Sequence, residues 1–260
     1  MPKLAANIDF LFTEWAFADR FQAARDAGFT AVEILFPYAH DPDVITTGFA
    51  RTGLKAALIN MPVGDVSSGD LGLACLPERQ DEFDQGVIAA EQLAVAVDTP
   101  TLHVVAGIGN PEDPAQTETY IRNVQQAADR MSTHGINISL EPINQRDRPG
   151  FFLLDNDHAA RLMEKIDRPN VFLQFDFYHT QLTNGDLGGQ WDRHAARTGH
   201  IQIANPPDRH EPGVGEVDYD HILKRIDDAG YRGWVSLEYV PSSDTLSSIK
   251  WAQSYLGGDK

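Results

Sequence analysis

The sequence is poor in cysteine and in long apolar runs, and each shortage excludes a class of protein. Cys75 is the one cysteine among the 260 residues, so no disulfide can form within the chain, as is usual for proteins of the reducing cytoplasm. No uninterrupted apolar run approaches the roughly 20 residues that a membrane-spanning helix needs. Residues Met1–Asn7 also lack the apolar stretch and the cleavage site of a signal peptide. We therefore expect a cytoplasmic protein that has no membrane partner.

Basic residues are also scarce. The chain has 21 lysines and arginines against 38 aspartates and glutamates, which gives a formal net charge of -17. Such a surface repels the phosphates of nucleic acids, so we expect no nucleic-acid partner. A small anionic substrate stays compatible with this charge, because single arginines within a site decide its local potential. The sequence contains neither a strict G-x-G-x-x-G motif nor a P-loop, and we expect no nucleotide cofactor.

Short apolar segments alternate with amphipathic segments along the whole chain. The predicted strands, rich in Val, Ile, Leu and Phe, are Leu4–Ile8, Ala31–Leu35, Leu54–Asn60, Leu102–Ala106, Ile136–Glu141, Val171–Asp176, His200–Ile203 and Trp234–Tyr239. Between them apolar residues recur at helical spacing, as in Phe83, Val87, Ala90 and Ala94. Alternation of strand and helix is typical of βαβ units with a parallel sheet. Eight such units over residues 1–260 predict one α/β domain, a single (β/α)8 TIM barrel, rather than an open doubly wound sheet.

Polar side chains stand at the carboxyl ends of these buried strands. They are Asn7, Glu33, Asn60, His103, Glu141, Asp176, Gln202 and Glu238. An unpaired charge buried at such a place is costly, and one divalent cation would satisfy the last four, through three carboxylates and the carbonyl oxygen of Gln202. Oxygen ligands suit Mg²⁺ or Mn²⁺ better than Zn²⁺ or Cu²⁺. The alternative is that each acid caps a helix or forms an ion pair, but polar ends on four consecutive strands favour the metal site.

Two residues beside these strand ends are candidates for substrate binding. His179 follows Asp176 by three residues, and a neutral imidazole there can hydrogen-bond a substrate oxygen; packing under a loop is the alternative. Arg209 lies after the seventh predicted strand and can bind a carboxylate through two parallel hydrogen bonds, although arginines in polar loops are usually solvated. Cys75 is expected to pack as a small apolar side chain, because no histidine partner is identifiable for it.

Several short motifs together resemble the signature of the hydroxypyruvate isomerase family. They occur in family order along nearly the whole chain, as Phe36-Pro37-Tyr38, Asn60-Met61-Pro62-Val63-Gly64-Asp65, Glu141-Pro142-Ile143-Asn144, Pro149-Gly150-Phe151, Asp176-Phe177-Tyr178-His179 and Glu211-Pro212-Gly213-Val214-Gly215-Glu216. This family belongs to the xylose-isomerase-like barrels, together with the ketose 3-epimerases and the endonuclease IV group. Ketose 3-epimerases usually carry histidine at the position of Gln202, and this difference favours the hydroxypyruvate isomerase branch. The segment Asn205-Pro206-Pro207-Asp208 departs from the Asp-Asn-Pro-like run of the relatives.

The resemblance implies an enzyme that interconverts hydroxypyruvate and tartronate semialdehyde (2-hydroxy-3-oxopropanoate). In such proteins the glutamates that match Glu141 and Glu238 form the acid/base pair. The metal positions of the superfamily fall on Glu141, Asp176, Gln202 and Glu238. A proton is removed next to the carbonyl group, an enediolate forms, and the neighbouring carbon is reprotonated, while Mg²⁺ or Mn²⁺ stabilises the enediolate oxygens. Predicted substrate contacts within or beside the motifs come from His179, Arg209, Asn60 and Glu211.

Other functions stay open on these residues. A 2-oxo-tetronate isomerase shares nearly all of the motifs, and a ketose 3-epimerase uses the same enediolate chemistry. A phosphodiesterase of the endonuclease IV kind would need a histidine-rich zinc site, yet only His103, His179 and His200 lie near predicted strand ends. A non-catalytic ligand-binding barrel would be indicated by loss of one glutamate, and both are present. Barrels of this family often associate, so a homodimer or a homotetramer that acts on a small keto acid or sugar is compatible with the sequence.

Overall fold

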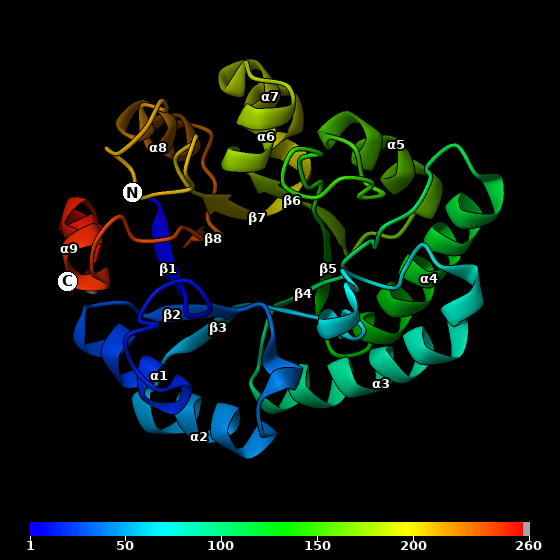
Figure 1. Cartoon of the computed structure of the whole chain (residues 1–260), viewed down its shortest axis with the longest axis horizontal. Coiled ribbons are helices and arrows are strands. Elements are labelled where there is room, and N and C mark those ends of the chain that lie inside the picture. The colour runs from blue at the N-terminus through cyan, green and yellow to red at the C-terminus, as the bar shows by residue number, and fades with distance from the viewer. Residues whose placement is uncertain (257–260) are drawn as a thin grey trace.

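The computed structural model describes residues 1–256, which form a closed barrel of eight parallel strands (Figure 1). The strands are β1 (Lys3–Asn7), β2 (Ala31–Ile34), β3 (Lys55–Asn60), β4 (Thr101–His103), β5 (Asn137–Leu140), β6 (Val171–Asp176), β7 (Thr198–Ile203) and β8 (Trp234–Leu237). Each strand pairs with the next one along the chain, and β8 pairs with β1, so the sheet has no open edge. The predicted (β/α)8 TIM barrel is confirmed.

The helices lie outside the ring of strands (Figure 1). They are α1 (Phe17–Asp26), α2 (Pro42–Thr52), α3 (Gln80–Ala96), α4 (Pro114–Ser132), α5 (Asn156–Ile166), α6 (Phe177–Thr183), α7 (Leu187–His194), α8 (Tyr219–Asp228) and α9 (Thr245–Ser248). Short 3-10 helices cover Pro37–Ala39, Val66–Ser68, Pro77–Arg79, Ala195–Arg197 and Lys250–Ser254. In α3 the predicted apolar stripe of Phe83, Val87, Ala90 and Ala94 is buried against the barrel. Within residues 1–256 no helix combines the length and the apolarity needed to cross a membrane.

Local sequence signals set several helix ends. Asp155 caps α5 by accepting a hydrogen bond from the backbone N–H of His158 at 2.7 Å, which satisfies a donor that the first turn leaves free. Gly53 ends α2 with a φ of 66°, in the left-handed region that other residues rarely adopt. The structure adds α6, which begins directly after β6 with Asp176 as its cap. The sequence alone did not indicate a helix so close to the end of a strand.

Several strands are shorter than predicted, and for β4 the reason lies in the loops. β4 stops at His103 and β8 stops at Leu237. Ala106, at the predicted end of the fourth strand, forms an isolated antiparallel bridge with Gly72 instead. Its burial therefore comes from the packing of two loops over the barrel and does not indicate a longer strand. The chain leaves the sheet early at both places and forms part of the rim around the cavity described below.

A layer of polar side chains crosses the interior of the barrel near this rim. Glu33 of β2, Gln174 of β6, and His200 and Gln202 of β7 are each at most 1% exposed. The Oε2 of Glu33 lies 2.5 Å from His200 Nε2, so the pair joins strands that are not neighbours in the sheet. Although burial raises the pKa of Glu33, the charge of His200 and several hydrogen bonds bring it below its ordinary value. The barrel therefore holds an ionised glutamate beneath the strand ends that carry the site.

Candidate active site

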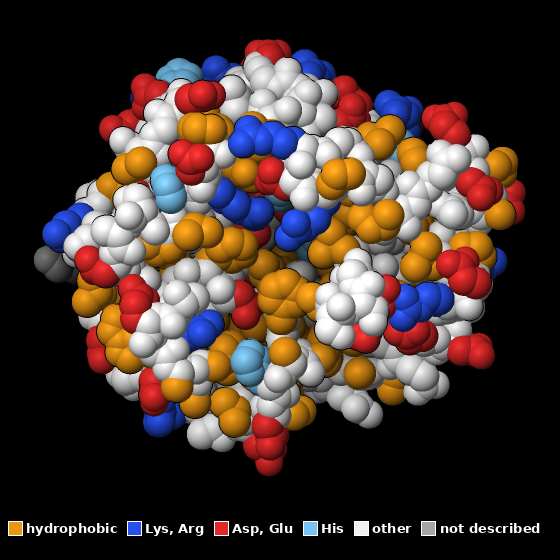
Figure 2. Space-filling view, in the orientation of Figure 1, with side chains coloured by type: hydrophobic (Ala, Val, Ile, Leu, Met, Phe, Trp, Pro, Cys, Tyr) orange, Lys and Arg blue, Asp and Glu red, His pale blue; other side chains and the backbone are white. Residues whose placement is uncertain are grey.

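A cavity of about 340 Å³ opens at the carboxyl ends of the strands, where TIM-barrel enzymes place their active sites. Its walls include residues that end or follow all eight strands, namely Phe10, Phe36, Asn60, His103, Glu141, His179, Arg209 and Glu238. Figure 2 shows the hollow in the middle of this face, with hydrophobic side chains around it and Lys or Arg side chains along one side. The cavity therefore brings polar groups from distant parts of the sequence into one apolar surrounding.

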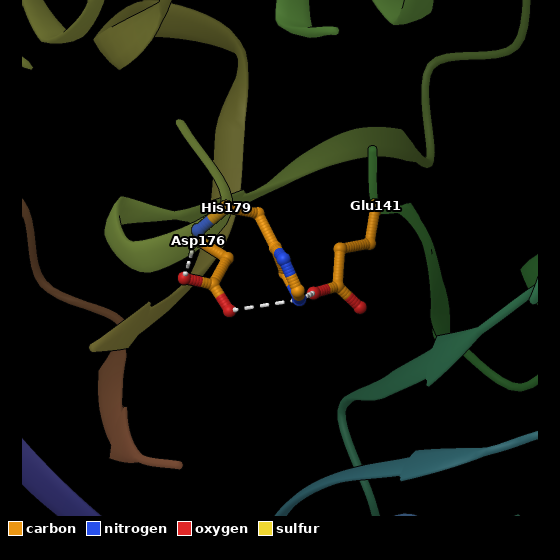
Figure 3. A group of neighbouring side chains, drawn as sticks. All are labelled: Glu141, Asp176 and His179. Carbon is orange, nitrogen blue, oxygen red and sulfur yellow. Dashed lines mark hydrogen bonds and ion pairs between the residues drawn. The ribbon is translucent and has the colours of Figure 1, made fainter. Parts of the chain in front are cut away.

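Glu141 follows β5 directly and lines the cavity (Figure 3). Its Oε2 accepts a hydrogen bond from Gln174 Nε2 at 3.0 Å, whereas its Oε1 is buried without a hydrogen-bond partner among the described residues. Burial and the neighbouring carboxylates of Glu238 and Asp176 raise the pKa of Glu141 well above its ordinary value. A buried carboxylate oxygen without a partner is costly, so this oxygen needs a cation or a proton beside it.

Asp176, the last residue of β6, uses its two oxygens differently. Its Oδ1 caps α6 and accepts hydrogen bonds from the backbone N–H groups of Tyr178 at 2.6 Å and His179 at 3.2 Å. Its Oδ2 lies 3.7 Å from His179 Nε2 (Figure 3). Burial raises the pKa of Asp176 to about 6, although Arg209 and the two backbone N–H groups act in the opposite direction. The helix-cap alternative is therefore correct for one oxygen of Asp176, and the other oxygen remains free for a ligand.

A chain of hydrogen bonds fixes the tautomer of His179. The Oδ1 of Asn144 accepts a hydrogen bond from the backbone N–H of Asp147 at 2.8 Å, and its Nδ2 donates to Asp147 Oδ2 at 3.1 Å, which orients the amide. The same Nδ2 lies 2.6 Å from His179 Nδ1, so Nδ1 accepts and Nε2 carries the hydrogen. Burial, together with the charges of Arg209 and Arg148, lowers the pKa of His179 well below its ordinary value. His179 is thus a neutral imidazole with an N–H at Nε2, as its predicted hydrogen bond to a substrate oxygen requires.

Glu141, Asp176 and His179 form a group whose carboxylates fit a divalent cation. One ligand atom from each of Glu141, Asp176 and His179 lies within 4.8 Å of the others, and all three residues are buried. The raised pKa values of the two carboxyl groups and the unpartnered oxygen of Glu141 indicate a shortage of positive charge at this point. A cation bound to Glu141 Oε1 and Asp176 Oδ2 would correct it. His179 directs its Nε2–H, and not a lone pair, toward the two carboxylates. Within this group, the carboxylates of Glu141 and Asp176 are therefore the groups that can bind a metal.

Glu238, directly after β8, contacts two neighbours with its two oxygens. Its Oε1 pairs with Arg209 Nη2, and its Oε2 accepts a hydrogen bond from Gln202 Nε2. The guanidinium carbon of Arg209 lies 4.9 Å from the ring centroids of both Phe10 and Tyr178, so both rings pack against the cation. Burial raises the pKa of Glu238 despite the opposing charge of Arg209. Glu141 and Glu238, the two predicted acid/base residues, therefore share one cavity.

The other predicted site residues occupy different places. The Oε1 of Gln202, the predicted ligand atom, accepts a hydrogen bond from Gln174 Nε2 at 2.7 Å; a carbonyl oxygen has two lone pairs, so metal binding by Gln202 stays a prediction. Asn60, at the end of β3, lines the cavity. Glu211 does not line it, because its oxygens accept hydrogen bonds from the backbone N–H and the hydroxyl of Ser242 at 2.9 and 2.6 Å. Contact between Glu211 and a substrate would require these bonds to break.

Comparison with known proteins agrees with this geometry. Residues 21–255 match the family described as xylose isomerase-like TIM barrel. The chain belongs to this family. It is 38% identical to 2-oxo-tetronate isomerase of Pectobacterium atrosepticum over 98% of both chains, and 36% identical to hydroxypyruvate isomerase of Escherichia coli over 98% of this chain and 100% of the relative. A crystal structure titled AP endonuclease, family 2, from Brucella melitensis is 41% identical with a TM-score of 0.96, and covers 98% of this chain and 100% of that one. The predicted relationship to hydroxypyruvate isomerases and the predicted enzyme class, an isomerase, are confirmed.

Gln174 and Arg148 are among the residues of this xylose isomerase-like site that were not predicted from the sequence. Gln174 holds Glu141, and its only signal in the sequence is one amide within the otherwise apolar first five residues of Val171–Asp176. Arg148 lines the cavity from the loop that follows β5. A loop without regular structure has no periodicity from which the direction of a side chain can be inferred. Residues at the ends of strands could therefore be placed at the site, whereas Gln174, within a strand, and this loop residue could not.

Proposed function

We propose that this protein isomerises a small 2-keto acid that carries a hydroxyl group on the neighbouring carbon. The observation that carries the proposal is the pair of buried glutamates, Glu141 and Glu238, which open from β5 and β8 into one cavity. Both carboxyl groups have raised pKa values, as is common for general acids and bases that act near neutral pH. The relatives named 2-oxo-tetronate isomerase and hydroxypyruvate isomerase support a keto acid as the substrate class.

The protein's own residues account for the proton transfers. Moving the carbonyl group from C2 to C3 requires loss of a proton from C3, an enediolate intermediate, and gain of a proton at C2. One of the glutamates takes the first proton as a base, and the other delivers the second as an acid. His179 donates its Nε2–H to a substrate oxygen that gains negative charge. Phe10 and Phe36 line the cavity and exclude water, which strengthens these polar interactions.

The proposed cofactor is Mg²⁺ or Mn²⁺. The residues that would hold it are Glu141 and Asp176, with Gln202 and Glu238 as further predicted ligands. When bound, such a cation stabilises the developing enediolate oxygens as a Lewis acid. The oxygen-rich donor set supports these metals over Zn²⁺ or Cu²⁺.

Hydroxypyruvate and 2-oxo-tetronate are the two substrates to compare, because they undergo the same carbonyl shift and differ by one hydroxymethyl group at C3. The cavity of about 340 Å³ lies at the lower end of small-molecule sites and accepts either acid. We expect at least one acid to be isomerised in deuterated water with Mn²⁺, with deuterium incorporated at the reprotonated carbon, as followed by NMR. Absence of both conversion and exchange with the two acids would contradict the proposal. If hydrogen exchange occurs with ketoses and with neither keto acid, the result would favour a ketose 3-epimerase over a keto-acid isomerase.

Arg148 is the arginine best placed to bind the carboxylate of a keto acid. Arg209 is already paired with Glu238, and this pair would be disrupted if Arg209 bound a substrate carboxylate through two hydrogen bonds. Arg148 is exposed, lines the cavity, and forms no ion pair within residues 1–256. Among the described residues its Nη1 donates only to the backbone carbonyl of Asp147, at 3.1 Å. Its guanidinium is therefore free to turn toward an anionic group and bind it through two hydrogen bonds.

The substitution Arg148→Gln is expected to raise the KM for the keto acid about 10- to 100-fold, because a hydrogen bond to a charged group contributes about 1.5–3 kcal/mol. Dihydroxyacetone has a hydroxymethyl group in place of the carboxylate of hydroxypyruvate, so its inhibition constant should stay nearly unchanged. Steady-state kinetics give both values. Arg146→Gln is the matched control, since Arg146 belongs to the same loop but reaches the backbone carbonyl of Pro207 and does not line the cavity. Equal effects of the two substitutions would exclude a specific role for Arg148.

An endonuclease of the kind named in the Brucella melitensis title has less support. Among residues 1–256 the candidate cation site contains one histidine, His179, with two carboxylates, which is a poor match for a histidine-rich zinc site. The net charge of -17 also opposes a DNA partner. Cleavage of an abasic-site DNA by the purified protein would reverse this preference.

A further inference from the structure

Gln174 forms a hydrogen-bonded link between the two glutamates. Its Nε2 donates to Glu141 Oε2 at 3.0 Å and to Gln202 Oε1 at 2.7 Å, and its Oε1 accepts a hydrogen bond from the Ser139 hydroxyl at 2.7 Å. Gln202 continues the chain, because its Nε2 donates to Glu238 Oε2. Two amide groups thus connect the carboxylates of Glu141 and Glu238 from below the cavity.

The link is anchored in the barrel interior and not in the loops of the rim. Gln174 and Gln202 are both 0% exposed. Besides its bond to Glu238, Gln202 Nε2 donates to Glu33 Oε1 at 2.8 Å, and Glu33 is held in turn by Asn7 Nδ2 at 2.7 Å. Residues from five strands therefore fix the two amides. Such a supporting arrangement is typical of side chains that orient reactive groups.

An irregularity in the sheet places Gln174 in this link. Leu173 of β6 pairs with Thr198 of β7, but the next residue, Gln174, pairs with His200, so Gly199 has no partner in the ladder. Side chains point alternately to the two faces of a strand. A shift of the pairing by one residue therefore changes which side chains of the two strands lie on the same face. The shift aligns the inward side chains of β6 with those of β7. Bulges of this kind occur next to active sites, where they redirect a side chain.

We propose that Gln174 is a positioning residue for the isomerisation. It binds Oε2 of Glu141, so that Oε1 is the oxygen left for the cation or for proton transfer, and it couples this orientation to Glu238 through Gln202. The effect on the rate rests on the proposed function, whereas the effect on the orientation of Glu141 does not. Two carboxylates that act on adjacent carbons must both stay within reach of one planar intermediate, and a displacement of about 1 Å can lower a rate about 10²-fold.

The first test is the substitution Gln174→Met, which keeps the size of the side chain and removes both hydrogen bonds of its amide nitrogen. We expect kcat to fall about 10- to 100-fold while KM changes little, because binding does not depend on the alignment of the glutamates. In deuterated water the ratio of hydrogen exchange to conversion should rise, since removal and delivery of the proton no longer act together. Ser139→Ala removes only the hydrogen bond to the amide oxygen of Gln174. It should therefore change kcat and the exchange ratio in the same direction but by less.

Gln190→Met is the matched control, because Gln190 is also a buried glutamine, 5% exposed, but lies in α7 outside the cavity. It should leave kcat and the exchange ratio unchanged. The second test is a crystal structure of the Gln174→Met protein, in which the Glu141 carboxylate is expected to turn or to adopt two orientations. The proposal would be overturned if both the orientation of the Glu141 carboxylate and kcat were unchanged in Gln174→Met. If Gln174→Met does not fold, wild-type kcat and Glu141 orientation in Ser139→Ala would overturn it instead. If the wild-type protein isomerises neither acid, the proposed function fails, and the orientation of Glu141 still decides the role of Gln174.

Discussion

Replacement of Glu141 or Glu238 by glutamine is expected to lower kcat for the keto acid by up to about 10⁴-fold. An amide keeps the shape of the side chain but cannot take up and release a proton in the reaction. The two variants should differ in hydrogen exchange at C3. The variant that lacks the base loses exchange and conversion together, whereas the variant that lacks the acid still exchanges but does not convert. NMR in deuterated water separates these outcomes and assigns the two roles.

The same two substitutions should stabilise the metal-free protein to different extents. Burial raises the pKa of both glutamates, so the ionised form of each is destabilised by folding at pH 8, and a neutral amide removes this cost. Glu238 also pairs with Arg209, and its substitution leaves a buried cation without its partner, which offsets part of the gain. Thermal unfolding at pH 8 should therefore shift upward more for Glu141→Gln than for Glu238→Gln. Near-normal turnover by either folded variant would remove that glutamate from the proposed mechanism.

The residues at the site differ in how far the sequence could place them. Parallel strands of a closed barrel all end at the same rim, so polar residues that end consecutive strands are expected to meet there. This reasoning brought Glu141, Asp176 and Glu238 together, and the structure places Glu141 and Glu238 in the wall of one cavity and Asp176 beside Glu141. It named a helix cap as an alternative role for these acids but could not assign it to Asp176, because the cap depends on a helix that starts without an intervening loop.

Loops and long-range hydrogen bonds account for what the sequence left open. Glu211 belongs to a family motif, yet its carboxylate is bound by Ser242, which is distant in the sequence. The partner of Gln202 is Gln174, and their contact depends on a register shift between β6 and β7 that leaves no mark in composition or periodicity. Arg148 extends from an irregular loop. Periodicity fixes which strand residues face inward, but it does not determine which of them bond to one another.

Removal of the divalent cation is expected to lower kcat by about 10³-fold or more, since such ions contribute several kcal/mol to the stabilisation of an enediolate. Binding of Mn²⁺ should also weaken as the pH falls from 8 to 6. Burial raises the pKa of Asp176 to about 6, and burial with two nearby carboxylates raises that of Glu141 well above its ordinary value. Protons then compete with the metal at both ligands. Isothermal titration calorimetry at pH 8, 7 and 6 measures the affinity, and a constant affinity would exclude these two groups as ligands.

The substitution Asp176→Asn separates metal binding from the structural role of this side chain. An asparagine oxygen can still cap α6, but the charge is lost, so the Mn²⁺ affinity should fall by more than the roughly 10–100-fold that loss of an outer-shell partner costs. Because the folded pKa of Asp176 is raised, the metal-free wild-type protein should lose stability as the pH rises through about 6. Asp176→Asn should not show this part of the loss, and Mn²⁺ should reverse it in the wild type alone. Equal Mn²⁺ binding by both proteins would place the cation elsewhere and leave Asp176 as a helix cap.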